Sequence, residues 1–208
     1  SLRRPSDWLS TALTGGATAS GEKVTTDSAM RQPVVWACVR AIAEDVATLP
    51  RKVYSRQPDG SREEMLAHPV ARLLSTQPNV EMTSMTMLEC MTAHVLLYGN
   101  AYAEIERDGA GKPVAIWPLL PDRMTIRIID GEVVYEYDAN TGERLTFTRD
   151  KIIHVKGLGS DGVIGYSPVT YARETIGMSK AMEKSGGAFF ANSSRPAGLL
   201  THPGRLSE

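Results

Sequence analysis

The chain has 208 residues, of which 42% are apolar, and its 23 basic and 24 acidic residues leave a net charge of −1. This length predicts one domain or two small ones. No apolar run approaches the roughly 18 residues that span a membrane, and no basic run offers the phosphate-neutralising patch of a protein that grips DNA. We therefore expect neither a membrane protein nor a strong non-specific DNA binder. Because the first residue is not Met, we expect the natural N-terminus to lie upstream.

The first quarter of the chain predicts an irregular segment, a helix and a strand. Residues 1–29 are rich in Ser, Thr, Gly and Ala and lack periodicity, which indicates a flexible arm. Residues 30–48 predict a helix that ends before Pro50. The apolar face of this helix contains Val35, Cys38, Val39, Ile42, Val46 and Leu49. Residues 51–56 alternate as a strand, and the Pro-Asp-Gly sequence at 58–60 predicts a turn.

Two further helices are expected before the sheet. His68-Pro69 opens a short helix, and Thr83 caps a longer one that runs to Tyr98, with Gly99 just past its end. The longer helix is apolar almost all round, which predicts burial. Its methionines are interpreted as core filler, although a promiscuous binding face is the alternative.

The cysteines and histidines do not indicate a metal or disulfide framework. Cys38 and Cys90 both lie in predicted helices and form no CxxC pair. We interpret them as small buried hydrophobes in a reducing compartment. The four histidines are scattered, without HxxxH or HxH spacing, so we expect no zinc site.

Between residues 100 and 155 the apolar pattern switches to a period of two, which predicts strands. Asp130-Gly131 is a strong signal for a two-residue hairpin turn, and residues 140–142 predict another turn. Consecutive hairpins form an antiparallel meander and not a βαβ series. The predicted class is therefore α+β, with an antiparallel meander sheet and packed helices.

Residues 148–192 combine a strand, a loop and a long helix in a fixed order. Residues 151–155 are rich in β-branched side chains and predict a short buried strand. The loop that follows contains Gly157, Gly159, Gly162 and Gly165. Ser167 is a good N-cap, and Pro168 suits the first helical position because its missing N–H needs no partner there. The helix is predicted to run from Pro168 to about Phe190.

This last helix carries apolar residues on two adjacent stripes, which predicts packing against more than one neighbour. One stripe contains Tyr171, Met178, Met182 and Phe189, and the other contains Val169, Ala172 and Ile176. Glycines weaken a helix, so those at 177, 186 and 187 need a reason. They either let another backbone come close or, for Gly186-Gly187, simply end or kink the helix.

The glycine loop raises the question of a nucleotide site. The sequence GLGSDG at residues 157–162 matches G-x-G-x-x-G. In dinucleotide-binding folds the helix begins inside this motif, so that its N–H groups meet the pyrophosphate. Here Pro168 opens the helix six residues beyond Gly162, and no strand ending in an acidic residue follows at the right distance. We prefer a structural loop, and a nucleotide-binding enzyme using residues 157–165 is kept as an alternative.

No other pattern requires an enzyme. The P-loop pattern G-x-x-x-x-G-K-[ST] and the G-x-S-x-G elbow are both absent from the sequence. Glu104 and Glu106 share a strand face, which we interpret as solvated and not as an acid–base pair. Asp161 is the best lone candidate for a functional carboxylate, although hydrogen bonding within a turn explains it more simply. We expect no catalytic residue and no cofactor.

The segment at 161–168 is more specific, because it resembles the D-G-x-x-G-x-S-P signature of portal proteins from long-tailed, double-stranded DNA bacteriophages. Its fixed positions are Asp161, Gly162, Gly165, Ser167 and Pro168, to which we assign a structural loop role. Further motifs similar to the family's follow in the same order along nearly the whole chain. They are PVVWACV at 33–39, HP at 68–69, PN at 78–79, GNAY at 99–102, PL with a second Pro at 118–121, FFAN at 189–192 and P-x-G-L-L at 196–200.

The resemblance implies a subunit of a ring, usually of twelve copies, at one vertex of a phage head. Double-stranded DNA passes through such a ring without sequence-specific binding, driven in by a separate terminase motor and released at infection. The implied partners are further copies, the terminase large subunit, and capsid, head-completion and tail proteins. The implied location is the virion, after assembly in the bacterial host cytoplasm.

By the same analogy, residues 30–167 form a wing-like domain, residues 168–192 a stem-like helix, and residues 193–208 the truncated start of a clip-like segment. A ring needs a surface that meets a different surface on the next copy, and the long striped helix suits this. We therefore predict subunit contacts at Tyr171, Ile176, Gly177, Met178, Met182 and Phe189. A non-viral interaction module with the same fold is the remaining alternative.

Overall fold

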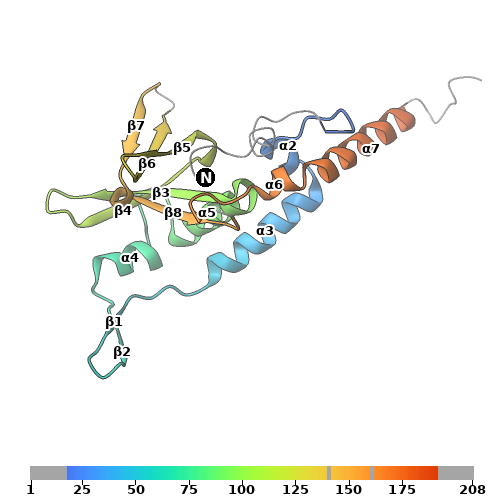
Figure 1. Ribbon diagram of the computed structural model, residues 1–208. Helices are drawn as coiled ribbons and strands as arrows, with labels where there is room; N and C mark the ends of the chain where they lie inside the picture. Colours follow the sequence, from blue (N-terminus) through green and yellow to red (C-terminus); the bar gives the residue numbers. More distant parts are fainter. Residues whose placement is uncertain (1–17, 140–141, 160–161, 192–208) are drawn as a thin grey trace, which may run out of the picture.

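The computed structural model describes residues 18–139, 142–159 and 162–191. It combines helices with antiparallel sheets, which confirms the predicted α+β class. Figure 1 shows a central body from which two parts project in opposite directions. One is the hairpin of strands β1 (Tyr54–Arg56) and β2 (Arg62–Glu64), and the other is helix α7 (Arg173–Ala191). Within the described ranges, no helix has the length and apolar character to cross a membrane.

The N-terminal part of the described chain is more ordered than predicted. Thr25 caps helix α2 (Thr26–Met30), its side chain accepting from the Ser28 backbone while the Ser28 side chain caps Thr25 in return. Ala29 of this helix is fully buried. The predicted flexible arm is therefore wrong for residues 18–29, because local capping and burial order them. Residues 1–17 of that arm lie outside the described part of the chain.

Helix α3 (Pro33–Thr48) begins later than predicted. Gln32 has an extended backbone and Pro33 occupies the first helical position, so the predicted helix from residue 30 is divided into α2 and α3. Helices α4 (Pro69–Ser75) and α5 (Ser84–Tyr98) agree with the predicted signals, including the Thr83 side chain as N-cap of α5.

The strands form two three-stranded antiparallel sheets in addition to the hairpin. Their bounds are β3 Asn100–Arg107, β4 Pro113–Leu119, β5 Met124–Ile129, β6 Glu132–Asp138, β7 Arg144–Phe147 and β8 Ile152–Lys156, with short 3₁₀ turns at Pro121–Arg123 and Arg149–Lys151. The strand orders are β4-β3-β8 and β5-β6-β7. The predicted meander is thus interrupted, because β8 returns to pair with β3 and not with β7. The Asp130-Gly131 turn between β5 and β6 is confirmed, and both residues have positive φ.

Three buried clusters hold these elements together. The first joins α4 and α5 to the β3–β4 face and contains Leu73, Met87, Met91, Ala101, Ala103 and Ile116. The second joins α2, α3, α5 and the C-terminal helices and contains Ala29, Val39, Leu97, Val169 and Ile176. The third lies between the two sheets and contains Tyr102, Leu119, Tyr135, Phe147 and Ile152. Because α5 contributes to two clusters, its nearly continuous apolar surface is used as core.

The two cysteines differ in exposure. Cys90 is half-buried, and its Sγ lies 3.6 Å from His94 Nε2. Cys38 is exposed, so its predicted burial is wrong. The reason is that α3 buries a different set of residues, namely Val39, Ala43 and Ala47 at intervals of four.

The turn before α5 depends on one buried amide. The Asn79 side chain donates to the Ile116 carbonyl at 2.8 Å and accepts from the backbone N–H groups of Glu81 and Met82. We expect Asn79→Ala to lower the free energy of unfolding by about 2 kcal/mol, because buried backbone groups lose their partners. Urea denaturation measures this change. The exposed Gln77→Ala is the matched control, and equal stability of the two variants would contradict the assignment.

Candidate functional site: helix α7 and the loop that precedes it

The loop before α7 is held against the end of α5 by close backbone contacts. Gly99 ends α5 with a φ of 78°, and its carbonyl accepts from Gly157 N at 2.8 Å. A Cβ atom on Gly99 would lie 2.1 Å from the Tyr166 carbonyl oxygen, and one on Gly165 would lie 2.0 Å from the Gly99 carbonyl oxygen. Both positions therefore require glycine, because any side chain would force the two backbones apart.

The side chain of Asn100 closes this contact. It is 6% exposed; its Oδ1 accepts from Gly165 N at 2.8 Å and its Nδ2 donates to the Gly165 carbonyl at 2.8 Å. One amide thus satisfies both polar groups of a buried loop residue, which would otherwise be costly to bury. We call Gly99, Asn100, Gly157 and Gly165 the junction clamp. Its residues lie in the predicted GNAY and glycine-loop motifs, but only the fold brings those motifs together.

His154 on β8 connects the junction clamp to the second sheet. Its Nε2 lies 3.1 Å from Asn100 Oδ1, and its Nδ1 lies 3.3 Å from the Tyr135 hydroxyl. Its ring also packs against Tyr102, with the ring centroids 4.4 Å apart. Burial, and to a smaller extent the nearby charge of Lys156, lowers the pKa of His154 to about 4. The neutral imidazole can donate a hydrogen bond from Nε2 to Asn100 Oδ1 and can accept a hydrogen bond at Nδ1 from the Tyr135 hydroxyl.

The helix that follows the loop starts as predicted but is divided. Ser167 caps α6 (Pro168–Tyr171), its hydroxyl accepting from Thr170 N and donating to the Leu97 carbonyl at 2.7 Å. Ala172 then leaves the helical conformation, with φ −87° and ψ 5°, and α7 begins at Arg173. The prediction of one unbroken helix from Pro168 is therefore wrong, because the helix is interrupted at Ala172. The Gly186-Gly187 pair does not end α7, which continues to Ala191.

The six predicted contact residues of this region fall into two groups. Ile176 is only 8% exposed and belongs to the core shared with α5. Gly177 is also buried, and a Cβ there would lie 2.6–2.9 Å from Thr18 side-chain atoms, so a side chain of the chain's own N-terminal segment, and not another backbone, lies close to it. The other four residues are exposed: Tyr171 60%, Met178 55%, Met182 65% and Phe189 54%. We call these four the α7 stripe; Tyr171 is the last residue of α6, and the other three lie in α7.

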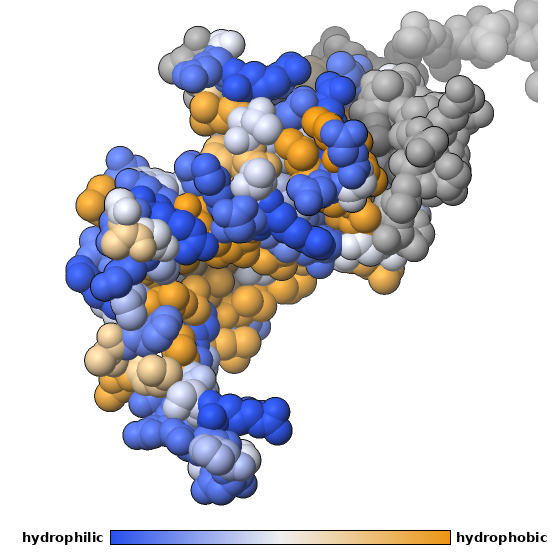
Figure 2. All heavy atoms as spheres, turned by 60° about the vertical axis from the view of Figure 1, so that its left-hand side comes forward, coloured by the Kyte–Doolittle hydropathy of each residue, from blue (hydrophilic) through white to orange (hydrophobic). Residues whose placement is uncertain are grey.

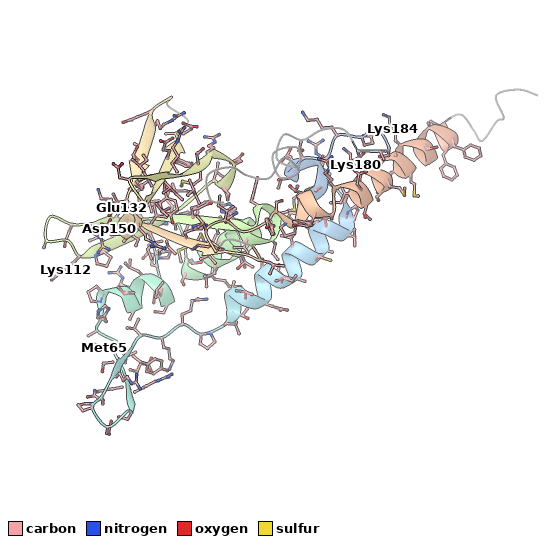
Figure 3. All side chains as sticks on the ribbon, viewed as in Figure 1. Met65, Lys112, Glu132, Asp150, Lys180 and Lys184 are labelled. Carbon is pink, nitrogen blue, oxygen red and sulfur yellow. The ribbon has the colours of Figure 1, made fainter. Side chains whose placement is uncertain are left out.

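The opposite side of α7 is polar, although it faces the chain's own N-terminal segment. Lys180 and Lys184 both pair with Glu22, at 3.7 and 3.2 Å, and Figure 3 shows both lysines on the side of α7 toward this segment. The Lys184 ammonium is the main reason that the pKa of the Glu22 carboxyl is lowered. Gln32 donates to Glu183 at 3.0 Å. A helix of a folded monomer normally turns its apolar face inward, and α7 does the reverse along this stretch.

The described parts of the glycine loop are folded against each other, and they form no nucleotide cradle. Tyr166 N donates to the Leu158 carbonyl at 2.7 Å, and a Cβ on Gly159 would lie 2.2 Å from the Ile164 carbonyl oxygen. The Ser167 side chain already occupies the N-terminus of α6, where a phosphate would bind. Asp161 lies outside the described residues. Among the residues that the structure describes, no three His, Cys, Asp or Glu side chains are grouped to hold a metal.

The arrangement defines a protein with a projecting helix and an apolar outer stripe, and comparisons place it in a family. The family model described as phage portal protein matches residues 33–208. The portal protein of Enterobacteria phage HK97 is 36% identical over 168 residues, which cover 80% of this chain and 39% of that protein. The probable portal protein of Streptomyces phage phiC31 is 34% identical over 207 residues, which cover 93% of this chain and 44% of that protein.

Solved structures agree with this assignment. A structure titled "Neck of empty GTA particle computed with C6 symmetry", where GTA is a gene transfer agent, matches with a TM-score of 0.70 and 28% identity. The match covers 90% of this chain and 52% of that one. The chain belongs to the phage portal protein family, which confirms the resemblance found in its motifs. It spans less than half the length of the two portal relatives described above.

Removing the Asn100 amide should loosen the junction clamp. We expect Asn100→Ala to lower the free energy of unfolding by about 2–3 kcal/mol, because Gly165 N–H and C=O both lose a buried partner. Hydrogen exchange should accelerate at the Gly165 amide, which the Asn100 side chain holds. The Ile116 amide, which donates to the Pro78 carbonyl outside the clamp, is the internal control. Unchanged exchange at Gly165 would show that the clamp does not depend on this side chain.

His154 should make stability depend on pH. Its folded pKa of about 4 lies below the usual 6.5, so the unfolded chain binds more protons between these values and the free energy of unfolding falls as pH is lowered. The stabilisation is complete above about pH 6.5. Because the imidazole is only half-buried, we expect a loss of about 1 kcal/mol between pH 7 and pH 4.5.

Urea unfolding of wild type and His154→Gln at both pH values measures this effect. The variant should lose less stability on acidification. Its free energy of unfolding should still fall somewhat as pH is lowered, because burial also lowers the pKa of His94. Identical slopes for the two proteins would contradict the assignment.

Proposed function

We propose that this chain is a subunit of a portal ring at one vertex of a phage head, and that α7 provides part of the contact between neighbouring copies. The observation that carries the proposal is the reversed orientation of α7. Its polar side meets Glu22 and Gln32 of its own chain, while Tyr171, Met178, Met182 and Phe189 face outward. Aromatic and methionine side chains are enriched at the centres of protein interfaces. Covering the stripe with a second copy removes this apolar area from water.

The ring itself requires two different surfaces on each copy and a rotation that closes. The symmetric neck assembly of the structurally similar gene transfer agent supports a homo-oligomer. Twelve copies is the number that the family resemblance implies, and we adopt it for this chain. In this proposal residues 30–167 act as the wing, and residues 168–192, which include α7, act as the stem that projects from it (Figure 1). The clip-like segment at 193–208 lies outside the described residues.

The proposed cargo is double-stranded DNA, which passes through the ring without sequence-specific binding. A near-neutral chain suits a channel through which DNA moves better than a protein that binds DNA tightly, because strong contacts with the phosphates would oppose each step of DNA movement. The portal family is structural and not enzymatic, and we assign no catalytic residue. The terminase large subunit, capsid proteins and head-completion and tail proteins are the proposed partners. The proposed location is the virion vertex, after assembly in the bacterial host cytoplasm.

A charge on the α7 stripe should block assembly without unfolding the subunit. We expect Met182→Glu to raise the protein concentration needed for half-assembly at least tenfold, which corresponds to about 1.4 kcal/mol, because a carboxylate would be desolvated in an apolar contact. Mass photometry across a dilution series measures this. Thermal unfolding of the subunit should stay unchanged, since Met182 is exposed.

The matched control is Ala188→Glu, which adds the same charge at an exposed residue on a different face of α7. It should assemble nearly like wild type. Equal assembly of the Met182 and control variants would remove the stripe from the interface, and a wild-type chain that stays monomeric at every concentration would count against the ring. Saturable binding of NAD or ATP in isothermal titration would favour the nucleotide-binding alternative instead.

A further inference from the structure

Helix α3 has a second apolar face that the described chain leaves uncovered. Val39, Ala43 and Ala47 are buried toward α5, on one side of the helix. A second line of apolar residues, at three- and four-residue intervals, lies about 100° around the helix axis from this buried side. This line contains Val34, Cys38, Ile42, Val46 and Leu49, all exposed, with Val34 at 68% and Leu49 at 59%. We call it the α3 stripe.

The α3 stripe carries almost no charge. Arg40, Glu44 and Asp45 are the charged residues of α3. Arg40 and Glu44 pair with each other at 2.6 Å on a different side of the helix, so only Asp45 lies within the stripe. A solvent-facing helix surface normally alternates charged and polar residues. A contiguous apolar line of this kind is typical of an interaction surface.

At its C-terminal end the stripe runs into an open cleft. Leu49, Met65 and Leu66 contribute exposed apolar side chains to this cleft, which has a volume of about 500 Å³ and lies between α3, α4 and the root of the β1–β2 hairpin. Arg51 fixes its floor by donating to the carbonyls of Ala47 and Leu74. Figure 2 shows hydrophobic atoms gathered in the region just above the hairpin, at the lower end of the molecule.

The hairpin itself is poorly supported by its own chain. Its strands pair with each other, and in the described part of the chain no other helix or strand packs extensively against them. Five of the six residues in β1 and β2 are exposed. An isolated two-stranded hairpin is marginal in water. A partner surface beside the cleft would support the hairpin and cover Leu66, which is 80% exposed.

We propose that the α3 stripe, together with the Leu49–Met65–Leu66 cleft, is a second subunit-contact surface and is covered by the next copy of this chain in the ring. The inference rests on the proposed ring. It adds a surface on the wing side of the molecule to the α7 stripe on the stem side. The partner is a protein surface with a complementary apolar patch and few charges.

The position of α3 relative to α7 is the reason for choosing a second copy as the partner. Both helices contribute to one buried cluster, where Val39 of α3 meets Val169 and Ile176 near the start of α7. From that cluster the two helices extend in opposite directions along one edge of the molecule (Figure 1). A neighbour that extends along this edge can therefore contact both α7 and α3. In a closed ring the copies must meet along such an edge.

Cys38 lies within the α3 stripe and provides a direct test without any substitution. Subunits and rings of the full chain are separated by size-exclusion chromatography and treated with a maleimide, and peptide mass mapping follows Cys38 and Cys90 separately. We expect Cys38 to react at least tenfold more slowly in the ring than in the subunit. Cys90, which is half-buried within its own chain, should change little and is the internal control.

Each outcome of this labelling experiment is decisive. Protection of Cys38 in the ring alone supports the second surface. Equal labelling in ring and subunit overturns it while leaving the ring intact, and slow labelling in both would mean that the chain covers its own α3, which overturns it as well. A chain that forms no ring contradicts the proposed function and also overturns the second contact surface, which depends on the ring.

A charge substitution tests the same surface energetically. Ile42→Glu, at a 46% exposed stripe position, should raise the concentration for half-assembly at least tenfold while leaving the melting temperature of the subunit unchanged. Ala37→Glu is the matched control, because Ala37 is exposed on another face of α3. Assembly of Ile42→Glu at the wild-type concentration would overturn the inference.

Discussion

Two hydrogen bonds between the side chain of Asn100 and the backbone of Gly165 fasten the loop before α6 to the start of β3. Without them the loop before α6 would bury an unsatisfied N–H and C=O, which is costly in a packed interior. The glycines at 99, 157 and 165 allow the backbones to approach closely enough for these bonds to form. Through His154 and Tyr135 the same network reaches the second sheet. The Asn100 side chain therefore links the loop that leads into α6 and α7 to both sheets.

The consequence of this arrangement is that the helices nearest the junction cannot bury all of their apolar surface. α3 turns one apolar line toward α5 and leaves a second line exposed. α7 places Ile176 in the core but keeps its other large apolar residues outside, and it uses Lys180 and Lys184 to hold the N-terminal segment through Glu22. A monomer would gain stability from the opposite orientation. In the proposed ring a subunit would gain from this orientation, because contact between copies would bury the exposed stripes.

Much of the fold was predictable from short stretches of sequence. The Thr83 cap, the Gly99 end of α5 and the Asp130-Gly131 turn were predicted correctly, because caps and turns depend on a few neighbouring residues. The pairing of β8 with β3 was not predicted, since it joins residues about fifty positions apart. Helix α2 was missed because its five residues show no apolar period, although Thr25 and Ser28 form a capping box that a closer search for caps could have found.

The amino-acid sequence by itself determined the family, because the D-G-x-x-G-x-S-P segment and the motifs around it are local patterns. It also determined that the helix after Ser167 carries more apolar surface than one neighbour can cover. Only the tertiary structure decided which part of that surface is exposed to solvent. Ile176 and Gly177 are used inside the chain, whereas Tyr171 and Met182 face outward. Helical periodicity cannot make this distinction, because an apolar residue has the same spacing whether its partner is its own core or another copy.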